Sequence, residues 1–386
     1  MNPLRILVCI DSLTGGGAQR QTVALLRGLD RTRFSPRVIS LHGPRMGLSR
    51  QFAADLKSAE IPVLELDRRW HWTELPASVW GLQKVRREFQ PDLIHSISHH
   101  CNHLTRALRL LPGPQFRLLT AIRTEYNARQ LRNERWEQRW SDAIVCNSPS
   151  MAGLLRERAR VPESRLHYIA NGLDVARFAR SPDPGLRDRL APGRRRLGVM
   201  MARITEQKAP ELLAEALGIL RFRGRLPADA EFWIVGERDS AATEARLRDA
   251  IRRHQLEQVI RIQPATDQPA SPLHAADFTV LFSLWEGTPN AVLESLAAGR
   301  PAIVSAAANA SGVIQDGVQG WVVPTSDIPA LADRLDRVLS LDDDALHSLA
   351  PRCLRLLSQQ RAPYQISAPV AAIREAFRSS ISPALS

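Results

Sequence analysis

Two glutamates eight residues apart, Glu286 and Glu294, flank a turn that the sequence predicts to join a strand to a helix. Residues 277–283 form an apolar run typical of a strand, Pro289 fits the first position of a helix, and Gly299 fits its end. Ligands of open α/β sheets bind where the strands end, and the free N–H groups of a helix N-terminus favour an anion there. Carboxylates beside that anion would repel it, so we expect Glu286 and Glu294 to accept hydrogen bonds from sugar hydroxyl groups on either side of it. The plainer alternative is an ordinary strand–helix connection with solvated glutamates.

A nucleotide-sugar has this layout, because its ribose and hexose lie on either side of a diphosphate. The loop Gly287-Thr288-Pro289-Asn290 would present backbone N–H groups to the diphosphate. The whole stretch 286–301 resembles the E-x7-E motif of retaining glycosyltransferases of family 4, which have the GT-B fold of two facing Rossmann-like domains. The resemblance is strongest over residues 200–325. It implies that Glu286 contacts the donor hexose and that Glu294 contacts the ribose.

The rarity of lysine gives a second indication of a phosphate site. Only Lys57, Lys84 and Lys208 occur among 52 basic residues, and Lys208 follows Arg203 by five positions, after a predicted strand. An ammonium group approaches a phosphate oxygen as a point charge, unlike a planar guanidinium, so a retained lysine suggests a geometric need. Chance placement is the alternative. The family resemblance implies that Arg203 and Lys208 clamp the diphosphate.

Glycine-rich turns follow two further predicted strands. Gly16 and Gly17 open a predicted helix from Gln19 to Leu29, and Gly236 ends the strand 231–236. The first turn lacks the G-x-G-x-x-G spacing and its acidic ribose partner, which argues against a nicotinamide cofactor. In the resembling family, a loop at Gly16 and Gly17 closes over the diphosphate and acceptor, and the nucleotide lies against the backbone at the position of Gly236.

Alternating strands and helices predict an α/β protein with two doubly wound parallel sheets and a cleft between the domains. We expect an acceptor-side domain over 1–175, a donor-binding domain over 176–363, and a last helix (364–380) that crosses back onto the first domain. The helices Ile328–Leu339 and Asp344–Leu357 are predicted to complete the second domain. The other predicted strands are Arg5–Ile10, Arg37–Leu41, Val63–Leu66, Asp92–Ile97, Arg117–Ile122, Ala143–Asn147, Arg196–Ala202 and Val259–Gln263.

Length and charge agree with this organisation. The chain has 386 residues, enough for two cores, and a net charge of +12. Residues 1–175 contain 26 Lys and Arg against 16 Asp and Glu, so most of the excess lies in the first half. A basic face suits an anionic substrate or membrane, and nucleic acid is disfavoured because no nucleic-acid-binding motif accompanies it. The alternative is an ordinary solvated basic surface. We expect a cytoplasmic protein, since no signal peptide, membrane span or C-x-x-C pair is present.

The histidine-rich run 95–103 suggests a metal site, because His99 and His103 would be i,i+4 on a helix. No second ligand cluster accompanies the run, so we favour either a role in lining the acceptor cleft or simple loop histidines, with His99 as the residue that would touch substrate. Many members of the resembling family have a histidine after the strand 117–122, where this chain has Arg123. An arginine cannot act as a base at neutral pH, so Arg123 either stabilises charge, binds an anionic donor or acceptor, or marks a diverged site.

Tryptophan and arginine occur together in Arg68-Arg69-Trp70-His71-Trp72, followed by Trp80, Lys84, Arg86 and Arg87. Such a patch suits peripheral contact with an anionic membrane, where a lipid-linked acceptor would be found. The alternative is tryptophans packed beneath a loop.

These features predict a retaining glycosyltransferase that moves a hexosyl unit from a nucleoside-diphosphate sugar, with UDP-sugar favoured, to a glycan or lipid-linked acceptor in polysaccharide or lipopolysaccharide biosynthesis. We expect no metal requirement, because Arg203, Lys208 and a helix N-terminus neutralise the diphosphate. Two alternatives stay open: a sugar-nucleotide epimerase of the same architecture, and a non-catalytic sugar-nucleotide-binding protein.

Overall fold

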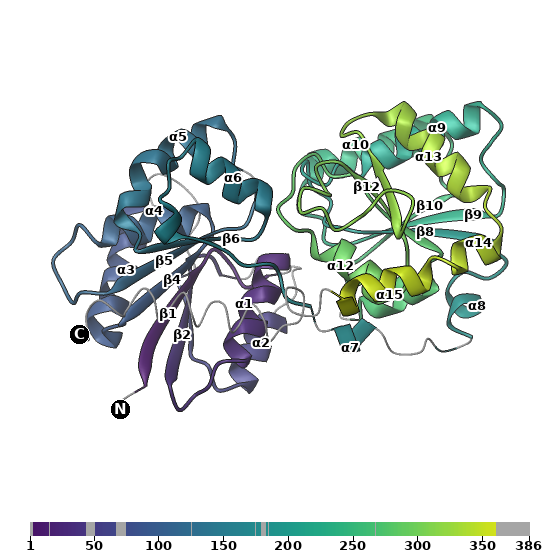
Figure 1. The fold of residues 1–386 in the computed structure, drawn as a ribbon. Helices are drawn as coiled ribbons and strands as arrows, with labels where there is room; N and C mark the ends of the chain where they lie inside the picture. The colour runs from purple at the N-terminus through teal and green to yellow at the C-terminus, as the bar shows by residue number, and fades with distance from the viewer. Residues whose placement is uncertain are drawn as a thin grey trace. The chain divides into compact units, whose positions relative to one another are not determined.

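The computed structural model of the protein describes residues 3–14, 16–43, 51–66, 75–124, 126–173, 175–178, 183, 185–266 and 268–359. The chain separates into two compact units that divide between Gly172 and Leu173 (Figure 1). The helix predicted over 364–380 lies outside the described residues.

The first unit is built on a parallel sheet of seven strands in the order β3-β2-β1-β4-β5-β6-β7. Its predicted strands are all found within a few residues of their expected ends, because a strand buried on both faces is a continuous apolar run. Strand β7 was not predicted, because Leu166-His167-Tyr168 is not an apolar run and only Leu166 is buried. The strands are β1 Leu4–Ile10, β2 Phe34–Ser40, β3 Val63–Glu65, β4 Leu93–Ile97, β5 Arg117–Ile122, β6 Ala143–Cys146 and β7 Leu166–Tyr168.

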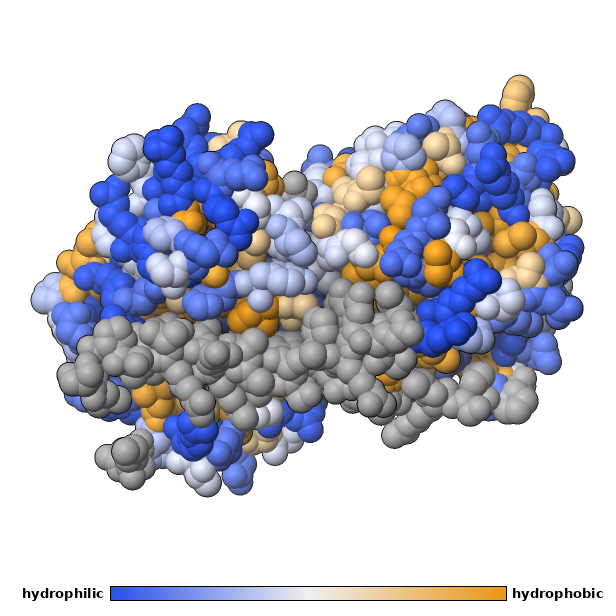
Figure 2. Space-filling model, in the orientation of Figure 1, coloured by the Kyte–Doolittle hydropathy of each residue, from blue (hydrophilic) through white to orange (hydrophobic). Residues whose placement is uncertain are grey.

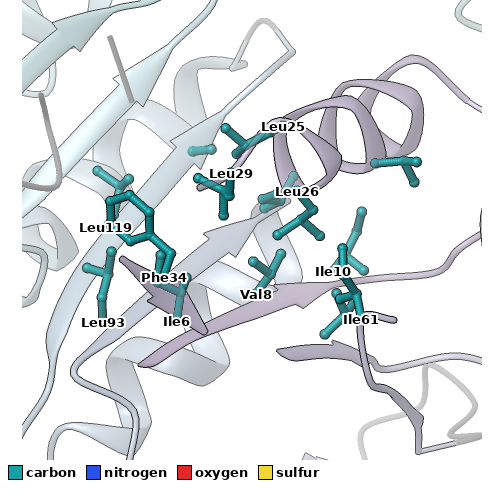
Figure 3. Close-up of a cluster of buried hydrophobic side chains, with 14 of the residues drawn as sticks. Ile6, Val8, Ile10, Leu25, Leu26, Leu29, Phe34, Ile61, Leu93 and Leu119 are labelled. Carbon is teal, nitrogen blue, oxygen red and sulfur yellow. The ribbon is translucent and has the colours of Figure 1, made fainter. Parts of the chain in front are cut away.

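Alternate residues of β1 supply the cores on the two faces of this sheet. Ile6, Val8 and Ile10 pack with Leu25, Leu26 and Leu29 at one end of the unit's first helix (Figure 3). Leu7 and Cys9 point the other way, into a cluster formed with the third and fourth helices. The helices of this unit are α1 Gly17–Arg27, α2 Gln51–Ser58, α3 Leu75–Phe89, α4 His99–Leu108, α5 Ala128–Glu137 and α6 Pro149–Glu157.

The second unit has a parallel sheet of six strands in the order β10-β9-β8-β11-β12-β13. The sequence predicted the first four strands along the chain and missed the last two, β12 and β13. The strands are β8 Arg196–Met201, β9 Ala230–Val235, β10 Ile260–Gln263, β11 Phe278–Leu281, β12 Ala302–Ser305 and β13 Gly320–Val323. The helices are α7 Val175–Phe178, α8 Leu186–Leu190, α9 Glu211–Phe222, α10 Ala241–Arg253, α11 Ala270–Ala275, α12 Asn290–Ala297, α13 Ile328–Leu339, α14 Asp343–His347 and α15 Ala350–Gln359.

The prediction of one helix over Asp344–Leu357 was wrong, because two helices, α14 and α15, occupy this stretch. Pro351 explains the break. A proline has no N–H to continue the hydrogen-bond ladder, and its ring collides with the carbonyl four residues earlier. It is tolerated at the second position of a new helix, where it lies in α15.

Each sheet reverses its strand order once. The reversal lies between β1 and β4 in the first unit and between β8 and β11 in the second. At such a point neighbouring loops diverge to opposite faces of the sheet, which leaves room for a ligand at the carboxyl ends of the strands. The four cysteines, Cys9, Cys101, Cys146 and Cys353, are buried and unbridged. None of the described helices is long and apolar enough to cross a membrane.

Candidate functional site

The loop after β11 leads through Glu286 into α12, as the sequence predicted. Pro289 is the N-cap of this helix and has extended backbone (φ −73°, ψ 117°), so it lies one position earlier than expected. Gly299 ends the helix with φ +71°, which favours glycine, and the N–H groups of Gly299 and Arg300 donate to Leu296 and Ser295. The end of the motif is therefore fixed by its own hydrogen bonds.

Both glutamates of the motif are buried. Glu286 is 6% exposed and Glu294 is 3% exposed, one turn into α12. Gly287, Thr288 and Pro289 between them are buried as well, and Asn290 is half-buried. Burying a carboxylate is costly unless it is paired, so ordinary solvated glutamates do not describe this site.

Glu286 has two partners on the loop that follows β8. Its Oε1 forms an ion pair with Nζ of Lys208, and its Oε2 accepts a hydrogen bond from Nε2 of Gln207 at 3.3 Å. Gln207 also donates to the Trp285 carbonyl at 2.8 Å, and its own carbonyl accepts from the Leu284 N–H at 2.9 Å. The two loops on either side of the strand-order reversal are thus joined, with Lys208 and Glu286 at the junction.

Arg203 lies on the same loop as Lys208 but has a different partner. Its Nη1 contacts Oδ2 of Asp239 at 2.6 Å, and its side chain is 41% exposed. Asp239 belongs to the loop after β9, which also pairs with the Arg203 loop through a backbone bridge between Ile204 and Arg238. The guanidinium is therefore held at one side and open to solvent at the other.

Gly236 has a structural role at the end of β9. A Cβ atom at this position would overlap with the carbonyl of Ala202, where β8 passes into the Arg203 loop. The glycine therefore allows the ends of the two strands to approach one another, whether or not a nucleotide lies there.

The corresponding loops of the first unit are also joined across the strand-order reversal. Ser98, which follows β4, donates from Oγ to Oδ1 of Asp11, which follows β1, at 2.6 Å. Ser98 is a non-glycine residue with φ +113°, a strained conformation of the kind found at functional sites. Burial raises the pKa of Asp11, but hydrogen bonds from His100 and Ser98 outweigh it, so the pKa is lowered overall.

The glycine-rich loop before α1 is described from its second glycine onward. Gly16 has φ +152° and ψ 162°, a conformation that L side chains rarely adopt, and it is the N-cap of α1. Gly17 is the first residue of the helix, which begins two residues earlier than predicted. Glycine is required here by the backbone, and a ligand role for either residue stays a prediction.

His99 lies at the start of α4, where both of its ring nitrogens are engaged within the protein. Nδ1 is 3.2 Å from the hydroxyl of Tyr126, and Nε2 is 2.9 Å from Nε2 of His103. Nδ1 of His103 lies 2.5 Å from a carboxylate oxygen of Glu137 on α5. Burial, followed by the neighbouring His103, lowers the pKa of His99 to about 4. Any contact between His99 and a substrate would therefore use the edge or face of its ring.

Arg123 follows β5 and has a neutral partner. Its Nη2 donates to Oδ1 of Asn171 at 2.5 Å, and Nδ2 of Asn147 donates to the same oxygen at 3.3 Å. No described carboxylate pairs with it, and burial lowers its pKa to about 10, where it is still protonated at neutral pH. The pKa of the buried His95 is lowered to about 3, first by burial and second by the positive charge of Arg123.

Sequence reasoning missed Gln207, Asp239, Asp11 and Asn171. The first two orient Glu286 and Arg203 from loops that lie far apart in the sequence, so no local spacing could reveal them. Asp11 offered a weak signal, since an acidic residue directly after a buried strand lies at the ligand-binding edge of the sheet. Among the described residues, no group of three or more His, Cys, Asp or Glu side chains could hold a metal ion.

The predicted patch of tryptophan and basic residues is largely untested. Arg68 to Trp72 lie outside the described residues. Arg86 does not belong to a surface patch, because it is 1% exposed and donates to the carbonyls of Leu108, Leu111 and Pro114. It joins α3 to the segment after α4, a structural role. Trp80 and Lys84 are exposed on α3.

Comparisons with known proteins agree for both halves of the chain. Residues 15–177 match the family described as Glycosyltransferase Family 4, and residues 195–341 match the family described as Glycosyl transferases group 1. The putative colanic acid biosynthesis glycosyltransferase WcaL of Salmonella typhimurium is 30% identical over 230 residues, which cover 57% of this chain and 53% of the relative. The UDP-Gal:alpha-D-GlcNAc-diphosphoundecaprenol alpha-1,3-galactosyltransferase of Escherichia coli is 24% identical, over 72% of this chain and 73% of the relative. The chain thus spans about half the length of WcaL and three quarters of the galactosyltransferase.

Solved structures share the fold. The crystal structure of Anabaena Alr3699/HepE in complex with UDP and glucose has a TM-score of 0.82 at 16% identity, over 97% of this chain and 100% of that chain. A glycosyltransferase from Rickettsia africae has a TM-score of 0.79 at 17% identity, over 99% of both chains. The two parallel-sheet units are those of the GT-B fold. Taken with the motif around Glu286 and Glu294 and the two matched families, this establishes that the chain belongs to glycosyltransferase family 4.

Proposed function

We propose that the protein is a retaining glycosyltransferase that moves a hexosyl unit from a nucleoside-diphosphate sugar to a glycan or lipid-linked acceptor in cell-envelope polysaccharide biosynthesis. The names of its relatives support this setting, since they include colanic acid and amylovoran biosynthesis glycosyltransferases and a galactosyltransferase acting on a diphosphoundecaprenol-linked sugar. UDP is the favoured donor nucleotide, because Alr3699/HepE was crystallised with UDP-glucose.

The observation that carries the proposal is the contact between Lys208 and Glu286 at the strand-order reversal of the second sheet. A half-buried ammonium and a buried carboxylate satisfy one another without ligand, yet each has chemistry suited to a different part of a sugar nucleotide. In our proposal Lys208 turns to a phosphate oxygen, and Glu286 accepts hydrogen bonds from the hexose hydroxyls. Exchange of one charge-assisted partner for another keeps both groups satisfied throughout.

Arg203 would neutralise the diphosphate from its solvent-open side, while Asp239 holds its other side. The N–H groups at the start of α12 would add to this neutralisation, and Glu294 would hold the ribose. The acceptor hydroxyl would then attack from the face that the diphosphate leaves, with the leaving phosphate taking its proton. Such a step needs positioning and charge neutralisation more than a side-chain base, and in this proposal the cationic side chains make a metal ion unnecessary.

Arg123 suits an anionic group in the acceptor or donor, because among the described residues its charge is paired with an amide oxygen and with no carboxylate. The contact with an anionic membrane predicted from Arg68 to Arg87 also stays a prediction, with Arg86 removed from it.

Donor hydrolysis tests the proposal most directly. A thermal-shift screen of UDP, ADP, GDP and their sugars identifies the donor, and slow release of free sugar from that donor is then followed with and without acceptor. We expect release by the wild type, release by the Glu206→Ala variant, whose carboxylate is exposed on the Lys208 loop, and none by Glu286→Ala. An epimerised product formed without acceptor would replace the proposal with an epimerase, and a bound donor that is never cleaved would indicate a binding protein.

A further inference from the structure

The outer face of α5 is a row of arginines. Arg129, Arg132 and Arg135 are exposed along this helix, and Arg139 is exposed in the 3-10 turn Gln138–Trp140 that follows it. At 100° per residue these positions fall within about one third of the helix circumference. Hydrophilic side chains accordingly cover α5 in the view of Figure 2.

No carboxylate that the structure describes pairs with this row. Within the described residues, none of the four guanidinium groups forms an ion pair with a carboxylate. The two acidic residues of α5 face inward: Glu134 pairs with the buried Arg106 at 2.6 Å, and Glu137 contacts Arg106 and His103. The outer face of the helix is therefore uniformly positive.

This arrangement of arginines lowers the stability of α5. Cations near a helix N-terminus oppose its dipole, and like charges three residues apart repel one another. Arg129 lies in the first turn of α5, and that turn contains no acidic residue. Charged side chains that destabilise their own helix indicate a role in binding another molecule.

Two tryptophans lie at the end of the row. The side chain of Trp136 is 61% exposed, one of the largest apolar surfaces that the described residues leave in solvent. The guanidinium carbon of Arg139 lies 5.4 Å from the ring centre of Trp136 and 5.2 Å from that of Trp140. An arginine between two indoles is an amphipathic group with both charge and apolar area.

We infer that the outer face of α5 and the following turn form a docking surface for the anionic headgroups of a phospholipid bilayer. A row of arginines along one helix contacts a plane, and each basic residue near an anionic bilayer contributes about a fivefold gain in binding. Indole rings prefer the bilayer interface, where their apolar body is buried and their N–H stays hydrated. Nucleic acid fits less well, because Arg139 already covers one face of both rings that would otherwise stack on bases.

This surface differs from the predicted patch around Trp80, and its role does not depend on the transfer reaction. Vesicle co-sedimentation without any donor tests it, using the full-length protein. We expect binding to vesicles that contain phosphatidylglycerol, no binding to vesicles of phosphatidylcholine alone, and weaker binding as salt is raised. The triple variant Arg129→Gln/Arg132→Gln/Arg135→Gln should bind roughly a hundredfold more weakly, and Trp136→Ala should lose the part of the binding that resists salt.

A matched control removes the same charge elsewhere. Arg248→Gln/Arg252→Gln/Arg253→Gln takes three exposed arginines from α10 in the second unit, where each pairs with a carboxylate. It should bind vesicles like the wild type, and circular dichroism should show both triple variants folded. Equal loss in the two variants would mean that net charge alone drives binding, and no vesicle binding by the wild type would overturn the inference. RNA binding that depends on Arg129, Arg132 and Arg135, without vesicle binding, would identify a nucleic-acid surface instead.

Discussion

The ammonium of Lys208 and the carboxylate of Glu286 neutralise one another in the protein without ligand, although each was predicted to hold a different part of a sugar nucleotide. The pair joins two loops that are distant in sequence and adjacent at the carboxyl edge of the second sheet. Ligand binding must separate this pair, and substitution of its two members should therefore have opposite effects on nucleotide affinity.

Replacement of Lys208 by alanine should weaken nucleoside-diphosphate binding by about 2 kcal/mol, the usual contribution of a charge-assisted hydrogen bond. The change also removes the ion-pair partner of Glu286 and leaves it only the hydrogen bond from Gln207, which adds repulsion toward the diphosphate. Titration calorimetry with UDP measures the effect. Lys84→Ala, which removes an exposed lysine of the first unit, should bind UDP as the wild type does. Equal affinity in all three proteins would exclude Lys208 from the site.

Replacement of Glu286 by alanine should separate binding from chemistry. UDP should bind about fivefold more tightly, because the ammonium of Lys208 is released from its internal partner. Sugar transfer should fall by about a hundredfold or more, the scale for loss of one contact that stabilises the transition state. Calorimetry and an acceptor-dependent transfer assay give the two values. A variant that keeps full transfer activity would show that Glu286 does not touch the hexose.

The sequence revealed the strands and the motif because both are local. A strand buried on two faces is an apolar run, and the E-x7-E motif lies within one strand–turn–helix unit. Strand β7 was missed because His167 interrupts its apolar pattern. Strands β12 and β13 are apolar runs as long as β6 and β11, so their pattern was present in the sequence and was overlooked. Gln207 and Asp239 were missed for a different reason, since the groups they orient belong to other loops.

Gly236 gives a prediction about stability. Gly236→Ala should destabilise the second unit by about 1–3 kcal/mol, since the new Cβ overlaps with the rigid carbonyl of Ala202. Gly153→Ala is the control: its Cβ would meet no atom within 4 Å in α6, and alanine favours a helix by about 1 kcal/mol. Thermal unfolding without nucleotide measures both. Wild-type stability of Gly236→Ala combined with lost UDP binding would assign this glycine to the ligand.

His95 predicts acid sensitivity of the first unit. The pKa of His95 in the folded protein is lowered to about 3 from an ordinary 6.5. Between these pH values the unfolded chain binds a proton at His95 and the folded chain does not. The contribution of His95 to the free energy of unfolding should be fully present above pH 6.5. It should fall as the pH drops toward 3, by up to about 1.4 kcal/mol per pH unit. Urea unfolding at several pH values measures the slope. His95→Asn should flatten it, and an unchanged slope would assign the acid sensitivity to other groups.

Substitution of Arg123 should affect donor hydrolysis and acceptor-dependent transfer differently. With its anionic partner in the acceptor, Arg123→Gln should leave slow donor hydrolysis intact and lower kcat/KM for acceptor-dependent transfer, because that anion would supply the carboxylate-like partner that no described residue supplies. Arg117→Gln, at the other end of β5 and paired with Asp142, is the control and should change neither rate. An equal loss of hydrolysis and transfer in Arg123→Gln would move Arg123 to the donor side.

Each sheet is assembled from one uninterrupted length of chain, β1 to β7 in the first unit and β8 to β13 in the second. Genetic recombination in the segment between β7 and β8 could exchange one sheet without disrupting the hydrogen bonds between the strands of the other. A lineage could in this way replace the ligand contacts of one unit while keeping those of the other.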